Sequence, residues 1–284
     1  MKQILGIVAS QRHLGNCEIM VKEVSRQLTV PHRLQLLRLP DFNLRYCNGC
    51  YRCLSKGGCV LDDDLATVLA AIADADALIL AAPTYFLGAH ACLKLFVDRG
   101  ISFYAMAERL WGKPAVGIGI AGIDGKEGST LLDIERLLLT LQAKNQMSTI
   151  VYGALPGEVM MSADNQRIAG ELAAALFGEV VARPPLCCPL CGGATVRFLG
   201  DGQVRCMLCS STGELVDGPA GLILKMAKGD HPFVVDQNAA LQHRDWLQGM
   251  LARYREQKAP LKEIKAAYQD QTTWIKPSGP QTDS

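Results

Sequence analysis

The chain has 284 residues, of which 49% are apolar and 20% charged, so it can fold around a substantial core. Its 29 Lys and Arg residues nearly balance its 28 Asp and Glu residues, which argues against binding nucleic acid or an anionic membrane through bulk charge. The apolar runs, such as 4–9 and 77–82, are far shorter than the roughly 20 residues of a membrane-spanning helix. Because the N-terminal run also lacks the length of a signal peptide, we expect a cytoplasmic protein without a membrane partner.

Strand and helix patterns alternate over the first part of the chain. Runs that fit buried strands lie at 4–9, 34–39, 77–82, 114–120 and 149–152, and Pro83 is expected to end the third. Helical patterns cover 16–28, 62–73, a stretch containing Leu93, Phe96 and Val97, then 131–144 and 165–181. This alternation predicts an α/β fold with a doubly wound, five-stranded parallel sheet. Ligands bind such sheets at the carboxyl ends of the strands, so the loops after the first, third and fourth strands are the candidate sites.

The character of the sequence changes at Arg183-Pro184-Pro185. Beyond this point the chain is rich in Cys, Gly and polar residues until about residue 214, and it is then expected to be helical. One helix face follows the i, i+3, i+4, i+7 pattern at Leu247, Met250, Leu251 and Tyr254, and residues 276–284 are expected to fray. We therefore divide the chain into domains 1–183, 184–216 and 217–284.

The loop Ser10–Cys17 joins the first strand to the first helix. A helix N-terminus presents unpaired N–H groups and the positive end of a dipole, which suits a phosphate. Ser10 and Asn16 can add hydrogen bonds, Arg12 can add a charge, and Gly15 allows close approach of the backbone. The alternative is an ordinary strand-to-helix loop in which Asn16 is the N-cap.

Three motifs carry a family resemblance. Ser-x-Arg-x-x-Gly-Asn at 10–16, Ala-Pro-Thr-Tyr-Phe-Leu-Gly at 82–88 and Leu-Lys-Leu-Phe-Val-Asp-Arg at 93–99 resemble the flavodoxin-like, NAD(P)H-dependent FMN reductase superfamily, over about residues 3–180. The resemblance implies that 10–17 binds the FMN phosphate, that 83–86 flanks the flavin ring and that 121–125 closes over it. Without it, Tyr85 and Phe86 could be core or interface aromatics. The implied cofactor-binding residues are Ser10, Arg12, Gly15, Asn16, Cys17, Pro83, Thr84, Tyr85, Phe86, Gly88, Ala121 and Gly122.

Two positions depart from the family pattern, because Cys17 replaces the usual Thr or Ser and Gln11 stands where Pro is common. The loss of a hydroxyl donor at Cys17 is expected to weaken flavin binding. Its place at a helix N-terminus also predicts a lowered thiol pKa and a possible reactive thiol.

The first cysteine group has the spacing Cys47-x2-Cys50-x2-Cys53-x5-Cys59. Four thiolates so close together suit an iron–sulfur cluster or zinc, and uncoordinated redox-active thiols are a third possibility. The compact motif resembles the iron–sulfur flavoproteins, a family of dimers or tetramers with FMN and one [4Fe-4S] cluster per subunit. The resemblance implies that these four cysteines are the cluster ligands. The run Asp62-Asp63-Asp64 that follows is expected to occupy the first turn of a helix, where acidic side chains favour the dipole.

The second cysteine group combines Cys188-x2-Cys191 with Cys206-x2-Cys209. A hairpin of 196–198 and 203–205, turning at 200–202, would bring the two pairs together. This pattern predicts a small ribbon module holding zinc, with a rubredoxin-like mononuclear iron as the alternative. Cys187 could replace Cys188, but the two-residue spacing favours Cys188.

We find no arrangement of Ser, His and Asp or of paired carboxylates that predicts a catalytic acid or base, and we expect the histidines to be surface or packing residues. The favoured interpretation is an iron–sulfur flavoprotein oxidoreductase that passes electrons between FMN and a [4Fe-4S] cluster. NAD(P)H or a carrier such as ferredoxin is the expected partner, and a homodimer or homotetramer the expected assembly. The alternatives are an NAD(P)H-dependent FMN reductase with only structural zinc, and a redox-sensing regulator that binds partners through the ribbon. Nucleic acid is disfavoured, since the ribbon offers only Arg197 and Arg205 as a basic surface.

Overall fold

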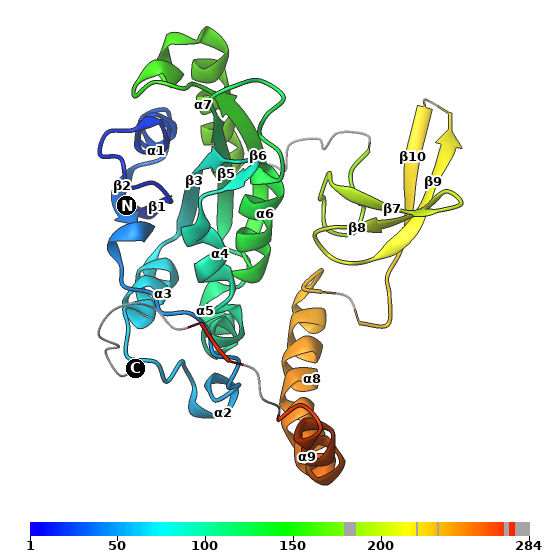
Figure 1. Cartoon of the computed structure of the whole chain (residues 1–284). Helices are drawn as coiled ribbons and strands as arrows, with labels where there is room; N and C mark the ends of the chain where they lie inside the picture. Colours follow the sequence, from blue (N-terminus) through cyan, green and yellow to red (C-terminus); the bar gives the residue numbers. More distant parts are fainter. Residues whose placement is uncertain (179–185, 220, 232, 270–272, 276–284) are drawn as a thin grey trace.

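The structure is a computed structural model that describes residues 1–178, 186–219, 221–231, 233–269 and 273–275. Its N-terminal part is a parallel sheet with the strand order β2-β1-β3-β5-β6 (Figure 1). The short β4 adds an antiparallel pair with β3. The α/β fold class and the five parallel strands are confirmed. The strands are β1 (Lys2–Val8), β2 (His32–Arg38), β3 (Ala77–Tyr85), β4 (Gly88–Ala89), β5 (Pro114–Ala121) and β6 (Lys144–Tyr152).

Helices cover both faces of this sheet because its central strands are apolar on both sides. Along β1, Leu5 and Ile7 pack into one core cluster with α3, α4 and α6, whereas Ile4 and Val8 pack into a second cluster with α1 and α7. The elements of this part are α1 (Asn16–Arg26), η1 (Leu39–Asp41), α2 (Cys53–Lys56), α3 (Leu65–Asp74), α4 (Ala91–Val97), η2 (Gly100–Met106), α5 (Ala107–Leu110), α6 (Thr130–Thr140), η3 (Glu158–Met161) and α7 (Ala163–Phe177).

Several predicted boundaries are wrong. Strand β3 does not end before Pro83 but continues to Tyr85, because proline tolerates an extended backbone and its carbonyl still accepts a hydrogen bond from the His90 N–H at 3.1 Å. Helix α6 ends at Thr140, which lets β6 begin at Lys144, five residues before the predicted start. The predicted end of the last helix at Val181, and the break at 183–185, lie outside the described residues.

The second cysteine group belongs to a four-stranded antiparallel sheet with the order β10-β9-β8-β7. The predicted hairpin is confirmed as β7 (Val196–Gly200) and β8 (Gln203–Cys206). The sheet continues through β9 (Thr212–Gly218) and β10 (Gly221–Ala227), so 217–218 and 221–227 are strand rather than the predicted helix. The apolar run 222–224 is too short to show a helical periodicity, and its backbone groups are paired with those of β9.

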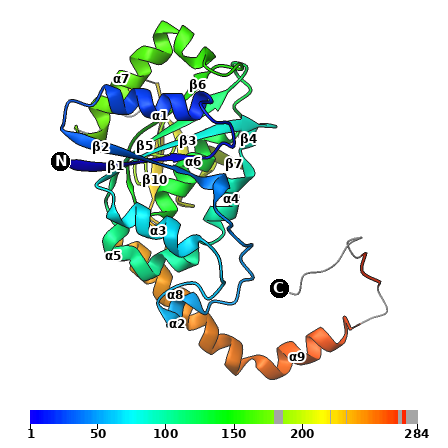
Figure 2. The same cartoon turned by 90° about the vertical axis from the view of Figure 1, so that its left-hand side faces the viewer.

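Helices α8 (Gln237–Glu256) and α9 (Lys258–Ala266) follow the ribbon sheet. Figure 2 shows α8 running past α5 and α2 and leading into α9. The Gln248 side chain donates to the Leu54 carbonyl at 3.5 Å, which joins α8 to the first cysteine segment. Leu132 of α6 packs in one cluster with three of the ribbon cysteines and Leu208, which attaches the ribbon to the parallel-sheet domain. No helix in the described ranges is long and apolar enough to span a membrane.

Candidate functional site

The loop after β1 leads into α1 through Gly15, which is the N-cap of the helix and makes no side-chain capping bond. The alternative role of Asn16 as N-cap is therefore wrong. The Asn16 amide instead donates to the Gly153 carbonyl at 2.9 Å and accepts from the Gly157 N–H at 2.8 Å, so it joins this loop to the loop after β6. A Cβ at Gly15 would lie 2.9 Å from the Arg12 Cβ, which explains the glycine. The first-turn N–H groups of α1 are left facing the loop, as phosphate binding requires.

A buried ion pair that the sequence did not predict braces this loop. Arg38, at the end of β2, donates to the Ser10 carbonyl at 2.9 Å and the Arg12 carbonyl at 2.8 Å. It also donates to Glu18 at 2.7 Å, and Glu18 accepts from the Leu14 N–H at 2.9 Å. Burial alone would raise the pKa of Glu18, but hydrogen bonds from Lys22 and Arg38 outweigh it and lower that pKa to about 2. Arg38 lies 28 residues from Ser10 and 20 residues from Glu18, and no motif in the sequence links these positions.

Cys17 differs from the prediction. Its side chain is buried in the core cluster of α1 and α7 rather than in the phosphate loop. Burial raises the pKa of this thiol to about 12, so the expected lowered pKa and reactive thiol are wrong.

The loop after β3 presents its aromatic residues to solvent. Phe86 is fully exposed and Tyr85 is 48% exposed, so neither is a core residue. Phe86 and Leu87 both have positive φ (49° and 65°), a conformation that turns the chain sharply into β4. Behind them, Thr84 and Thr130 share a hydrogen bond of 2.8 Å between their hydroxyls. The loop therefore presents an exposed aromatic surface, and the hydrogen bond between Thr84 and Thr130 fixes the backbone behind it.

The three loops after β1, β3 and β5 meet at one edge of the sheet, because these strands are neighbours in the order. The third loop begins at Ala121 and Gly122, and beyond it Tyr152 donates to Glu127 at 3.3 Å. The uncapped helix start, the close approach at Gly15 and the exposed aromatic loop fit a flavin mononucleotide with its phosphate on α1.

The first cysteine group lies on the segment between η1 and α3. Cys47 is exposed and the other three are half-buried. All four line one narrow pocket together with Arg99 and Ser102. Burial raises the pKa of Cys53, and the neighbouring Cys59, Cys50 and Cys47 raise it further, so the four sulfurs already influence one another.

Arg99 is the buried neighbour of this group. Its guanidinium donates to the Cys59 Sγ at 3.0 Å and the Arg45 carbonyl at 2.7 Å, and it forms an ion pair with Asp63 in which both side chains are 1% exposed. The acidic run was expected at the start of a helix, and α3 begins at Leu65 with Asp64 as its N-cap residue. Asp63 also has a second role as the partner of Arg99. It also accepts from the Arg45 N–H at 2.9 Å and the Leu65 N–H at 3.2 Å.

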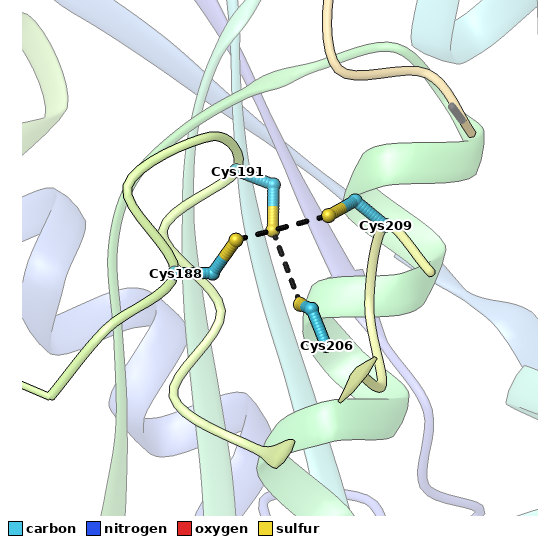
Figure 3. Close-up of side chains that lie close together, drawn as sticks. All are labelled: Cys188, Cys191, Cys206 and Cys209. Carbon is cyan, nitrogen blue, oxygen red and sulfur yellow. Dashed lines mark hydrogen bonds between the residues drawn. The ribbon is translucent and has the colours of Figure 1, made fainter. Parts of the chain in front are cut away.

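The second cysteine group is already gathered. Figure 3 shows the side chains of Cys188, Cys191, Cys206 and Cys209 converging. Within the described part of the chain, this is the group of four possible metal ligands whose sulfurs all lie within 4.8 Å of one another. The structure thus selects Cys188 rather than Cys187.

The spacing of these sulfurs fits a single tetrahedral ion. The Cys188–Cys209 and Cys191–Cys206 sulfur pairs are 3.8 and 3.5 Å apart. Four ligands at a zinc–sulfur distance of about 2.3 Å would place sulfurs about 3.8 Å apart. Backbone N–H groups of Gly193 and Leu208 each donate to a sulfur at 3.4 Å.

The histidines hold structural positions. The His90 ring accepts from the Cys92 N–H at 3.2 Å at the start of α4, and His32 bonds Ser25 at 2.8 Å. His231 and His243 lie 2.7 Å apart between their ring nitrogens and pack against Trp246. These contacts agree with the packing role expected from the sequence.

Comparisons with known proteins identify relatives of the parallel-sheet domain. Residues 2–152 match the sequence profile described as NADPH-dependent FMN reductase. An iron–sulfur flavoprotein of Archaeoglobus fulgidus is 30% identical over 156 residues, which are 55% of this chain and 70% of the relative. An iron–sulfur flavoprotein of Methanocaldococcus jannaschii is 30% identical over 141 residues, which are 48% of this chain and 72% of the relative.

Among solved structures, a flavone reductase superposes with a TM-score of 0.71 at 19% identity and covers 97% of this chain and 100% of its own. The likeness extends beyond the parallel sheet to the ribbon and the C-terminal helices. It shows that the whole arrangement of elements recurs in another protein.

Proposed function

The chain belongs to the NADPH-dependent FMN reductase family and is a flavin-dependent oxidoreductase, and on that premise we propose that it passes electrons between FMN and a [4Fe-4S] cluster held by the cysteine segment 47–59. One observation carries this proposal. A groove of about 380 Å³ is lined by Gln11 of the phosphate loop, Tyr46 beside the first cysteine and His90 behind the aromatic loop. The cysteine segment thus approaches the same edge of the sheet as the flavin loops.

In this proposal the FMN phosphate binds the start of α1, where Ser10, Gly15 and the backbone that Arg38 fixes form the cradle. The flavin ring would be held by Tyr85, Phe86 and the loop at Ala121 and Gly122. When bound, FMN supplies hydride chemistry and can exchange one or two electrons. The chain positions the ring, excludes water with the exposed aromatic side chains and needs no acid or base of its own.

The four cysteines of the first group would hold the cluster. Their thiolates are the ligands that iron–sulfur clusters use. Their sulfurs surround one pocket without collapsing to the spacing of a single ion, which agrees with a larger inorganic centre. We propose that the cluster exchanges single electrons with a ferredoxin-like carrier, while NAD(P)H exchanges a hydride at the flavin.

The second group is a metal site separate from this path. We propose zinc, which has no redox chemistry and would stabilise the ribbon. A mononuclear iron is the alternative that the same sulfur spacing allows. Following the family resemblance, we also propose a homodimer or homotetramer.

Anaerobic reduction tests the proposed electron path. Protein purified without air is mixed with NADH or NADPH, and flavin absorbance and the EPR signal of a reduced cluster are followed together. We expect the flavin to bleach first and the EPR signal to appear afterwards. Cys53→Ser should keep the bleaching and lose the EPR signal, whereas Cys187→Ser, which alters a cysteine outside both groups of four, should keep both. Bleaching without any cluster signal in the wild-type protein would contradict the proposal and leave an FMN reductase with structural zinc.

A further inference from the structure

Arg99 is the charged side chain most deeply enclosed beside the first cysteine group. It follows α4, far from the cysteines in sequence, and its side chain is 1% exposed. One amino group of the guanidinium lies 3.0 Å from the Cys59 Sγ and 3.4 Å from Asp63 Oδ1. The other contacts Asp63 Oδ2 and lies 2.7 Å from the Arg45 carbonyl. A planar guanidinium held at both ends has a fixed direction, and here that direction is toward the sulfur.

The charge of this group persists despite burial. A guanidinium stays protonated in proteins, and the ion pair with Asp63 places a counter-charge beside it. Arg99 is therefore a permanent cation in contact with one sulfur of the group. Burial raises the pKa of Asp63, but the hydrogen bonds from Arg99 and from the Arg45 and Leu65 N–H groups together lower it, so it stays charged as well.

A cation that donates a hydrogen bond to a ligand sulfur stabilises the more negative oxidation state of a cluster. Adding one electron makes the centre more negative, so the contact with Arg99 strengthens on reduction. A nearby anion acts in the opposite sense. The low dielectric of a buried position makes both effects larger than they would be at the surface.

We propose that Arg99 is a positioning residue that sets the reduction potential of the centre at the first cysteine group through its hydrogen bond to Cys59, with Asp63 as the opposing charge that aims it. This inference rests on the proposed function, because it requires a redox-active cluster at that group. Arg99 raises the potential and Asp63 lowers it.

The opposite effects of Arg99 and Asp63 on the reduction potential can be tested. Anaerobic protein is titrated with dithionite at fixed pH, and the EPR signal of the reduced cluster is measured against the solution potential. For Arg99→Gln we expect the ratio of reduced to oxidised cluster at a given potential to fall about tenfold, which is about 59 mV for one electron. For Asp63→Asn, which keeps the shape of the side chain, we expect a shift in the opposite direction. Arg99→Lys keeps the charge and should shift less than Arg99→Gln.

Arg109→Gln is the matched control, because Arg109 forms an ion pair with Asp74 on the exposed surface of α5. It removes the same charge and should leave the potential unchanged. If Arg99 had a purely structural role, Arg99→Gln and Asp63→Asn would both lose cluster. Their reduction potentials would then not shift in opposite directions.

The outcomes separate the two proposals. Wild-type protein prepared without air that contains no acid-labile sulfide would overturn both the cluster and this inference. A fully loaded cluster whose potential is the same in the wild type and Arg99→Gln would overturn this inference alone. If Arg99→Gln does not load the cluster, Asp63→Asn decides: a higher potential supports the inference, and an unchanged or lower one contradicts it.

Discussion

The two cysteine groups of this chain are built by opposite means. In the ribbon, two Cys-x2-Cys turns and the strands beside them place four sulfurs within 4.8 Å of one another. In segment 47–59 the cysteines lie on a loop with one short helix, and Cys47 is exposed. The buried ion pair of Arg99 and Asp63 beside Cys59 fixes the position of this segment. The difference indicates that the ribbon is prepared for one ion of fixed radius. The four cysteines of the first group instead line a pocket without the close spacing of the ribbon sulfurs, and we propose that a larger centre binds there.

The largest predicted effect breaks the ribbon. Cys209→Ser removes a buried ligand from a preformed tetrahedral site, and structural zinc contributes about 10 kcal/mol or more to folding in small zinc domains. We expect bound metal at this site to fall from about one ion per chain to none. Limited proteolysis should then cut within 186–227 while the parallel-sheet domain stays intact and keeps its flavin.

The control for the ribbon is Cys187→Ser, which changes the neighbouring cysteine outside the group of four. It should keep its metal and its resistance to protease. Loss of metal in Cys187→Ser with retention in Cys188→Ser would show that the ligand set is wrong.

In the loop after β1, an ion pair rather than a metal fixes the backbone. Glu18→Gln removes the buried charge that Arg38 and the Leu14 N–H contact. We expect it to lower the free energy of unfolding by about 2 to 3 kcal/mol at pH 7 and to weaken FMN binding. Urea unfolding and flavin fluorescence measure the two effects.

The pH dependence of this loss follows from the lowered pKa of Glu18, which is about 2 in the folded chain. A carboxyl with a lowered folded-state pKa stabilises the protein fully above its unfolded-state pKa of about 4.3, and the contribution disappears as the pH falls from there toward 2. The difference in unfolding free energy between wild type and Glu18→Gln should therefore shrink with acid over that window. Glu23→Gln is the control, because Glu23 is a half-buried carboxylate of the same helix whose partner Arg26 is exposed. An equal loss in that variant would contradict the role of Glu18.

The first cysteine group should respond differently from the ribbon. Cys59→Ser is expected to remove the iron and acid-labile sulfide while it leaves the ribbon metal and the FMN in place. Because the segment lies on the surface, we expect the melting temperature to change little compared with Cys209→Ser. Metal analysis and calorimetry on the same sample check this, and loss of the ribbon metal in Cys59→Ser would show that the two sites are not independent.

The smallest effect concerns reactivity. With the cluster removed, the exposed Cys47 should react with iodoacetamide at pH 8 far faster than Cys17, whose burial raises its pKa to about 12. Peptide mapping by mass spectrometry should show at least a tenfold difference in the extent of modification. Equal labelling of the two in the native protein would contradict the burial of Cys17.

Patterns that repeat locally were predictable from the sequence. The alternation of apolar runs and helical periods gave the parallel sheet, and the paired Cys-x2-Cys spacing with a Gly-Asp-Gly turn gave the ribbon hairpin and the ligand choice of Cys188. These features depend on neighbours in the chain, so their spacing carries the information. The strands β9 and β10 were not predicted, because the apolar run 222–227 is short and the conformation of each strand depends on its pairing with the other.

Single side chains that meet across the fold were not predictable. Arg38 and Glu18 lie 20 residues apart and Arg99 and Asp63 lie 36 apart, and nothing in either interval marks the pair. Cys17 was misjudged because its position at a helix N-terminus says nothing about which side of the helix it faces. Its burial in the core, which decides its pKa, depends on the packing of α1 against α7.

The central claim is that one chain holds a flavin, a multi-iron cluster and a separate single ion. The most direct measurement is quantification of iron, zinc, acid-labile sulfide and FMN on one anaerobically purified sample. We expect about four iron, four sulfide, one FMN and one zinc per chain. A fifth iron in place of zinc would change only the ion of the ribbon. Flavin without sulfide, in protein never exposed to air, would contradict the presence of a cluster in this chain.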